Sequence, residues 1–338
     1  MKKKIGFAIL AILGVVAVIF GDMVAYGLSQ AKGQLTVVWN ARPIEDWLAE
    51  GNLSDDEIYK LQLIQEIRRF AFDSLGINES ENYTKLYYEG DETTLWVITA
   101  CEPFAFKSKE WKFPLLGTFS YKGYFDKEKA KAELEELKAG GWDVSGRAVS
   151  GWSTLGWFKD PVLSSMLKRK EGDLANLIIH ELSHGSIFIK DDTDQNENVA
   201  TFIGDKGAEL FLIQKFGADS EELKQYLNSK DDYRRFAEYW LEASIELEQF
   251  YAELDTSNVE RAKKLKEEKI SELVEGLKEV PFHNEEVYHD YFADLPNNTF
   301  IMNFRRYRSK QNIFQEEFEM DFEQNLKNYI AHLIKKHG

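Results

Sequence analysis

Two histidines four residues apart, with a glutamate between them, form the pattern in this chain that most clearly carries chemistry. His180-Glu181-Leu182-Ser183-His184 lies in residues 173–187, where apolar residues recur at helical spacing. Side chains at i and i+4 share one face of a helix, so both imidazoles can bind one metal ion. Glu181 then lies beside that ion and can take a proton from a water activated by the metal. We predict a helix capped by Asp173, with His180 and His184 as metal ligands and Glu181 as general base.

The third ligand decides which kind of metal site this is. An all-histidine site of the metzincin type needs Gly at position 187 and His at position 190, where this chain has Ile187 and Lys190. A polar turn over 190–195 precedes a second predicted helix from 196 to about 216, with Glu197 in its first turn. A helical hairpin would return Glu197 to the histidines. Three protein ligands with an open fourth position are typical of a catalytic zinc site.

The sequence leaves other interpretations of these residues open. The two histidines can instead face solvent, or they can lie in a hydrophobic core with their ring nitrogens hydrogen-bonded. Glu209, three turns further along the second helix, competes with Glu197, although a solvated helix face is its simpler explanation. Three acids in the turn are candidates for calcium, but such acids are usually just solvated: Asp191, Asp192 and Asp194.

Several stretches together resemble a bacterial family of predicted aminopeptidases whose site is of the gluzincin kind. The matching stretches are His180-Glu181-x-x-His184, Asn196-Glu197-x-x-Ala200-Thr201-Phe202, residues 113–117, 121–125 and 151–161, and Asn297-Asn298. The resemblance covers most of the chain from about residue 26. It implies a zinc-dependent peptidase, with one Zn²⁺ bound by His180, His184 and Glu197 and with Glu181 as base. Gluzincins often carry an acid four residues after the ligand glutamate, and Thr201 stands there.

The N-terminus has the pattern of a membrane anchor. Three lysines, Lys2 to Lys4, precede an apolar run from Ile5 to Phe20, and the run resumes at Met23–Tyr26 after Gly21 and Asp22. No clear small-x-small cleavage site follows, which favours an uncleaved anchor over residues 1–26. The lysines are expected to stay in the cytoplasm, which places a domain of residues 27–338 outside it, in the periplasm or at the cell surface.

Composition limits the classes of partner. The net charge of −16 argues against nucleic acid, and the 14% of aromatic residues argue against disorder. The single cysteine, Cys101, makes an intramolecular disulfide or a cysteine-based zinc site impossible, and its apolar surroundings indicate a buried thiol. The oligomeric state is not revealed.

The remaining pattern predicts a predominantly helical α+β fold of the zincin type. Helices are expected near 43–48, 54–75 and 126–138, with a long helical hairpin over about 219–279 that includes a helix from Asp231 to Leu254. Residues 83–88 and 93–100 are expected to form a β-hairpin, 117–125 to be irregular, and 143–150 to form a strand.

Two further sets of residues are candidates for contact with a peptide substrate. Within 151–161, an extended segment with Ser153, Thr154 and Gly156 could pair with the backbone of a peptide substrate through main-chain hydrogen bonds. The aromatic side chains of the same stretch could line a pocket for a substrate side chain: Trp152, Trp157 and Phe158. The oxyanion of a zinc peptidase is usually stabilised by a His or Tyr donor. Tyr307 is the first candidate, with His289 and Tyr291 as alternatives. Packing roles are the competing explanation for all of these side chains.

The function that these patterns favour is a zinc-dependent peptidase, expected to be an aminopeptidase and anchored in the membrane. A non-catalytic envelope protein that binds metal and peptide is the main alternative. A membrane protein whose helical hairpin docks a partner is the other.

Overall fold

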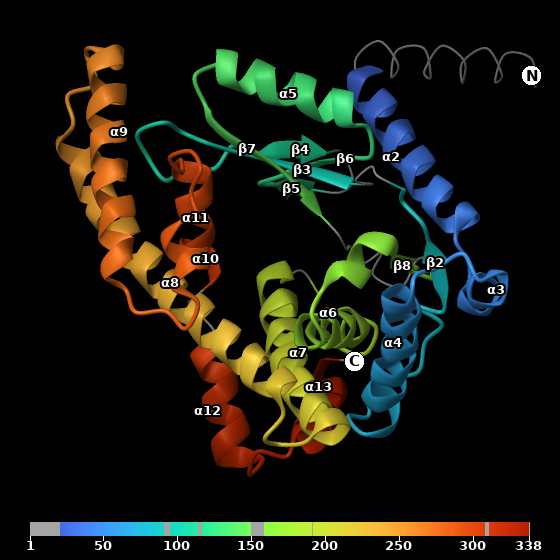
Figure 1. Cartoon of the computed structure of the whole chain (residues 1–338). Helices are drawn as coiled ribbons and strands as arrows, with labels where there is room; N and C mark the ends of the chain where they lie inside the picture. Colours follow the sequence, from blue (N-terminus) through green and yellow to red (C-terminus); the bar gives the residue numbers. More distant parts are fainter. Residues whose placement is uncertain are drawn as a thin grey trace, which may run out of the picture.

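The computed structural model describes residues 21–90, 95–113, 117–149, 159–190, 192–307 and 311–337. Within them helices predominate, and the strands form three small sheets. Figure 1 shows one helical body around α4 (Asp55–Asp73), α6 (Glu171–Ser183) and α7 (Thr193–Phe216), with a sheet-containing part beside it. The long hairpin of α8 (Glu221–Glu253) and α9 (Val259–Gly276) lies at the margin. The predicted helical α+β class is therefore confirmed.

Three helices hold the largest hydrophobic core. α4 (Asp55–Asp73) begins with a capping box, in which Ser54 and Glu57 satisfy each other's backbone N–H groups. α6 (Glu171–Ser183) and α7 (Thr193–Phe216) pack along each other as a hairpin. α12 (Gln311–Asp321) and α13 (Leu326–His337) cover α7, where Phe202 contacts Phe318 and Tyr329.

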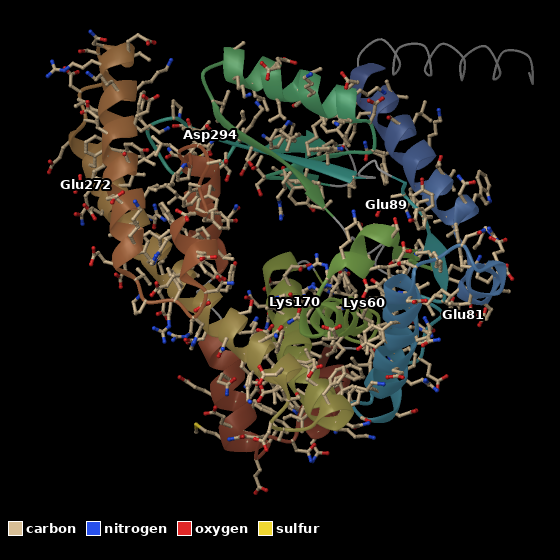
Figure 2. All side chains as sticks on the ribbon, viewed as in Figure 1. Lys60, Glu81, Glu89, Lys170, Glu272 and Asp294 are labelled. Carbon is tan, nitrogen blue, oxygen red and sulfur yellow. The ribbon has the colours of Figure 1, made fainter. Side chains whose placement is uncertain are left out.

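A buried ion pair joins α6 to α4. Lys60 Nζ lies 2.7 Å from Glu171 Oε1, and the Lys60 side chain is only 7% exposed. Figure 2 labels Lys60 where the two helices meet. Because a buried ammonium group is costly without a partner, this pair holds the first turn of α6 against α4.

The main sheet is antiparallel, with β3 (Leu95–Cys101) between β6 (Lys122–Tyr124) and β7 (Asp143–Val149). β4 (Trp111–Phe113) pairs with β5 (Gly117–Phe119) beside it. α5 (Lys127–Ala139), capped by Asp126, covers this sheet (Figure 1). The strand predicted over 143–150 and the helix predicted over 126–138 are thus confirmed. The irregular structure predicted for 117–125 is wrong, because two short strands lie there.

The predicted β-hairpin over 83–88 and 93–100 is wrong. β2 (Lys85–Tyr87) pairs with β1 (Arg42–Pro43) and, in parallel, with β8 (Val162–Leu163), whereas β3 lies in the main sheet. Val162 and Leu163 are at most 1% exposed, so this pairing seals part of the core. Alternation of apolar and polar residues indicates a strand but not the strand with which it pairs. The parallel partner of β2 is β8, which lies about 75 residues further along the chain.

The long helical hairpin is present, but its first helix begins earlier than predicted. α8 spans Glu221–Glu253, because the Ser220 side chain accepts a hydrogen bond from Leu223 N and caps the helix there. α9 (Val259–Gly276) returns along it, followed by α10 (Glu285–His289) and α11 (Asn298–Tyr307). An aromatic cluster around Phe236 and Trp240 packs the hairpin onto α11. α3 (Ile44–Glu50) is a short helix near the N-terminal end.

Asn298 ties the hairpin to the main sheet. It is fully buried, and its Oδ1 accepts a hydrogen bond of 2.7 Å from the Tyr251 hydroxyl on α8. Its Nδ2 donates to the carbonyls of Glu102 and Pro103, which follow β3, and its backbone N–H donates to Asp143 at the start of β7. The Asn297-Asn298 pair in the sequence is therefore a structural junction.

Most of the predicted anchor lies outside the described residues. Residues 1–20 are not among them, and residues 21–26 open α2 (Gly21–Asn40). Among the described helices, none is both long enough and apolar enough to cross a bilayer.

Candidate metal centre

α6 carries His180 and Glu181 in its last turn, and His184 follows at the C-cap position. Leu174, Ile178 and Leu182 are at most 2% exposed and hold one face of the helix in the core. The predicted cap at Asp173 is wrong, because α6 begins at Glu171 and Asp173 lies within its first turn. Two glycine-free turns of well-packed helix thus present both imidazoles from a rigid support.

Asn196 shapes the turn that brings α7 back to α6. Its Oδ1 accepts a hydrogen bond of 2.7 Å from Ile189 N, and its Nδ2 donates to the carbonyls of Ile189 and Asp192. Asp192 caps α7 through Gln195 N, so this acid is occupied in holding the turn. α7 therefore begins at Thr193, and Glu197 lies in its second turn instead of the predicted first.

The hairpin brings one carboxylate to both imidazoles. Glu197 Oε2 lies 3.4 Å from His180 Nε2, and Glu197 Oε1 lies 3.5 Å from His184 Nε2. The two imidazole rings are 5.0 Å apart between centroids and nearly perpendicular, at 83°. One ligand atom from each of the three residues lies within 4.8 Å of the other two. Zinc ligands at about 2.0–2.2 Å in tetrahedral geometry are themselves about 3.4 Å apart, so this donor set fits a zinc ion.

Glycines on α7 make the close approach of the two helices possible. A Cβ at Gly204 would lie 3.0 Å from the Asn176 carbonyl oxygen and 3.0 Å from His180 Cβ. A Cβ at Gly207 would lie 2.9 Å from Ile179 on α6. Any side chain at Gly204 therefore pushes α7 away from the turn that carries His180.

The charges of the three residues respond to burial and to one another. Burial disfavours the charged form of His180, but the hydrogen bond with Glu197 and the charges of Glu181, Glu197 and Asp205 raise its pKa above the usual value. Burial lowers the pKa of His184. Burial opposes ionisation of Glu197, yet its two histidine neighbours keep its pKa below the usual range.

Glu181 sits in an acidic and largely buried environment. Burial raises the pKa of its carboxyl to about 7, and the charges of Glu197 and Asp160 add to that effect. Asp160 is 3% exposed, and its backbone is held by hydrogen bonds with Tyr83 N at 2.7 Å and with the Asn82 side chain at 3.2 Å.

Tyr83 is buried with a positive φ of 62°, a backbone conformation that costs energy for a bulky residue.

Comparison with known proteins assigns the chain to a family. The model of a family described as "Putative aminopeptidase" matches residues 25–336. The chain belongs to this family. Membership indicates a peptidase. Neither the curated proteins nor the solved structures compared with the chain give a match.

Not every predicted site residue of this family member lies at the centre. Glu209 pairs with Lys206 at 3.7 Å on α7, as a solvated helix face predicts. His289 contacts the Val280 carbonyl and Phe282, and Tyr291 packs on Phe236, so the contacts of both belong to the aromatic cluster on α8.

Three predicted elements of the site fall where the structure gives no description. Tyr307 ends α11, but its side chain lies outside the described part, so its role as oxyanion donor stays a prediction. The predicted pocket residues over 151–158 lie outside the described residues, as does Asp191 of the calcium alternative.

Sequence reasoning missed the residues that surround the centre. The charge of Asp160 acts on Glu181, and the charge of Asp205 acts on His180. Tyr83 lies near enough to Glu181 for that carboxyl's charge to raise the pKa of Tyr83, after burial as the larger cause. None of the three carries a spacing signal relative to the HExxH pattern. Tyr121 lies in the turn between β5 and β6. Burial raises the pKa of its hydroxyl, and the nearby charge of Glu197 raises it further. Asn196 had one signal, its position next to Glu197 in one of the stretches that carry the predicted resemblance.

Proposed function

We propose that this protein is a zinc-dependent aminopeptidase with a zincin-like domain, in which His180, His184 and Glu197 bind one Zn²⁺. The observation that carries the proposal is the pair of distances, 3.4 and 3.5 Å, from the two imidazole nitrogens to one carboxylate. Two imidazoles and one carboxylate with an open fourth position are the donor set of catalytic zinc sites. Family membership supports the peptidase part of the proposal.

The chemistry divides between the ion and the chain. Zinc, when bound, supplies Lewis acidity that polarises the scissile carbonyl and makes a water more acidic. Glu181 accepts the proton from that water as the water attacks the carbonyl carbon. The same carboxyl then donates this proton to the leaving amine nitrogen as the C–N bond breaks, so the base is regenerated. Burial raises the pKa of this carboxyl above the usual range of a glutamate, so it holds a proton more readily than an exposed glutamate does.

The acidic surroundings support a preference for substrates with a free amino terminus. Glu181, Glu197 and the buried Asp160 place three carboxyl groups close enough to influence one another. Their negative potential favours a protonated amine over a neutral blocked terminus. Peptides acetylated at the N-terminus are therefore expected to be poor substrates.

We also propose that residues 1–26 anchor the protein in a membrane with the catalytic domain outside the cytoplasm. The support is in the sequence, where three lysines precede the apolar run from Ile5 to Phe20.

The decisive experiment replaces the proposed base. Glu181→Gln keeps the shape of the side chain but cannot accept a proton, so turnover of a free-amine peptide should fall by about 10²–10⁴-fold. Bound zinc, measured by elemental analysis, should remain at one ion per chain. Glu209→Gln, on a solvated helix face, is the matched control and should change neither quantity.

Three outcomes would contradict the proposal. Full activity of Glu181→Gln would remove Glu181 as base. Activity that survives complete removal of metal by a chelator would remove the zinc mechanism. Bound zinc with no hydrolysis of either free or blocked peptides would favour a protein that only binds peptides.

A further inference from the structure

One face of α2 is built into the domain. The Tyr26 hydroxyl donates a hydrogen bond of 2.8 Å to the Gly123 carbonyl on β6, and its ring stacks on Phe113 at 5.4 Å. Gly33 lies against the Phe125 ring, and Val37 is 1% exposed in the main core. α2 is therefore held along its length by the folded part of the chain, at the margin of the molecule (Figure 1).

The opposite face of α2 is apolar and open to solvent. Val24 is 42% exposed, Leu28 67% and Trp39 78%. Ala31 is also exposed and Leu35 is half-buried. Steps of four, three, four and four residues place these five side chains in one stripe along the helix. We call Val24, Leu28, Ala31, Leu35 and Trp39 the α2 stripe.

The charge along α2 contrasts with the rest of the chain. Charged residues make up 30% of the sequence, but this helix of 20 residues contains only Asp22 and Lys32. A water-facing helix normally carries charged side chains on its outer face, and this one carries an exposed tryptophan and leucine instead. Such a face indicates that its partner is also apolar. The exposed tryptophan adds that this partner borders a polar phase, because an indole ring combines an apolar body with a polar N–H group.

The sequence before α2 points to the identity of that partner. The apolar run from Ile5 to Phe20 ends one residue before α2 begins at Gly21, and the stripe begins three residues later. We propose that the α2 stripe lies in the surface of a lipid bilayer, so that α2 is an interfacial helix that fixes how the catalytic domain sits on the membrane. The inference rests on the proposed anchor and is independent of the peptidase chemistry.

Site-specific labels in the full-length chain test this contact. Cysteine is introduced at Leu28, at Trp39 or, as a control, at Met320 on α12, which is as exposed as Trp39 at 78%. The native Cys101 is buried, and burial raises the pKa of its thiol to about 11, so it should not react with the label. Each labelled chain is reconstituted in phosphatidylcholine vesicles that carry nitroxide quenchers at the depth of the headgroups.

Labels at positions 28 and 39 should be quenched at least two-fold more than the label at 320. Equal quenching at all three positions, in a chain that still floats with the vesicles, would overturn the inference and leave the anchor intact. Cross-linking of Leu28→Cys between two chains without lipid quenching would assign the stripe to a second copy and also overturn it. A full-length chain that does not float would overturn both the anchor and this contact, while the Glu181→Gln result would still stand.

Discussion

The proposed metal centre depends on Glu197. Its two oxygens lie near one imidazole each, so the carboxylate links the last turn of α6 to the second turn of α7. Its side chain is nevertheless 57% exposed, which leaves an approach to the site open from solvent. As a proposed metal ligand, Glu197 would contribute to metal affinity, and its exposed side chain is not needed to fill the core.

Replacing this proposed ligand should weaken zinc binding and leave the fold intact. Glu197→Gln keeps the size of the side chain but removes the charge that a dication requires, so zinc affinity should fall by at least about 10-fold, as it does when even supporting groups of a metal site are lost. The measurement is a competition titration with a zinc chelator, with melting temperature as the test of folding. Glu209→Gln on the same helix should bind zinc like the unaltered chain. Unchanged affinity of Glu197→Gln would rule out this residue as a ligand.

The α6–α7 hairpin sets the geometry between elements. At one end of the hairpin, the Lys60–Glu171 ion pair holds the start of α6 against α4. At the other end, the hydrogen bonds of Asn196 hold the turn between α6 and α7. Between them, Gly204 and Gly207 let the helix backbones approach more closely than residues with a Cβ allow. Helix packing thus helps to position the side chains of the proposed metal ligands.

A single methyl group on α7 should disturb both the fold and the centre. In Gly204→Ala the new Cβ meets the Asn176 carbonyl and His180 Cβ at 3.0 Å, so the helices must separate. We expect a loss of about 1–3 kcal/mol in the free energy of unfolding and weaker zinc binding in the folded protein. Gly27→Ala in α2 is the matched control, because nothing lies within 4 Å of its added Cβ. That change should stabilise by up to about 1 kcal/mol. Equal effects of the two substitutions would contradict the packing argument.

At the scale of the whole molecule, Asn298 connects parts that are far apart in the sequence. It joins α8, the segment after β3 and the start of β7 through side-chain and backbone hydrogen bonds. Lys266 on α9 approaches the same Asp143 carboxylate and donates to the Pro103 carbonyl at 2.8 Å. A polar junction of this kind holds the helical hairpin in one orientation on the sheet.

Removing the Asn298 side chain should loosen the whole molecule. Asn298→Ala leaves the Tyr251 hydroxyl and the Glu102 carbonyl without this partner in a fully buried site, whereas the Pro103 carbonyl keeps its hydrogen bond from Lys266. We expect this to cost about 2–4 kcal/mol of unfolding free energy. Chemical denaturation measures this loss. Asn284→Ala, at an exposed position where the side chain caps no helix, should cost less than about 0.5 kcal/mol. A loss at Asn298 no larger than at Asn284 would show that the junction does not stabilise the fold.

The amino-acid sequence by itself determined part of the local structure. The caps at Ser54 and Asp126, the helices that follow them and the strand over 143–149 depend on neighbours a few residues away, so their pattern is legible in the chain. For the same reason the sequence determined that His180, Glu181 and His184 belong to one helical segment. The buried state of Cys101 also followed from its immediate apolar neighbours.

Tertiary structure alone decided what depends on distance between segments. It paired β2 with β8 instead of β3, brought Glu197 and not Glu209 to the histidines, and placed Asp160 near Glu181. It also turned Asn297-Asn298 into a junction and left the α2 stripe uncovered. The physical reason is that hydrogen bonds of caps and turns are satisfied within a few residues. Strand partners, helix separation and the electrostatic surroundings of a carboxyl are settled only when the whole core packs.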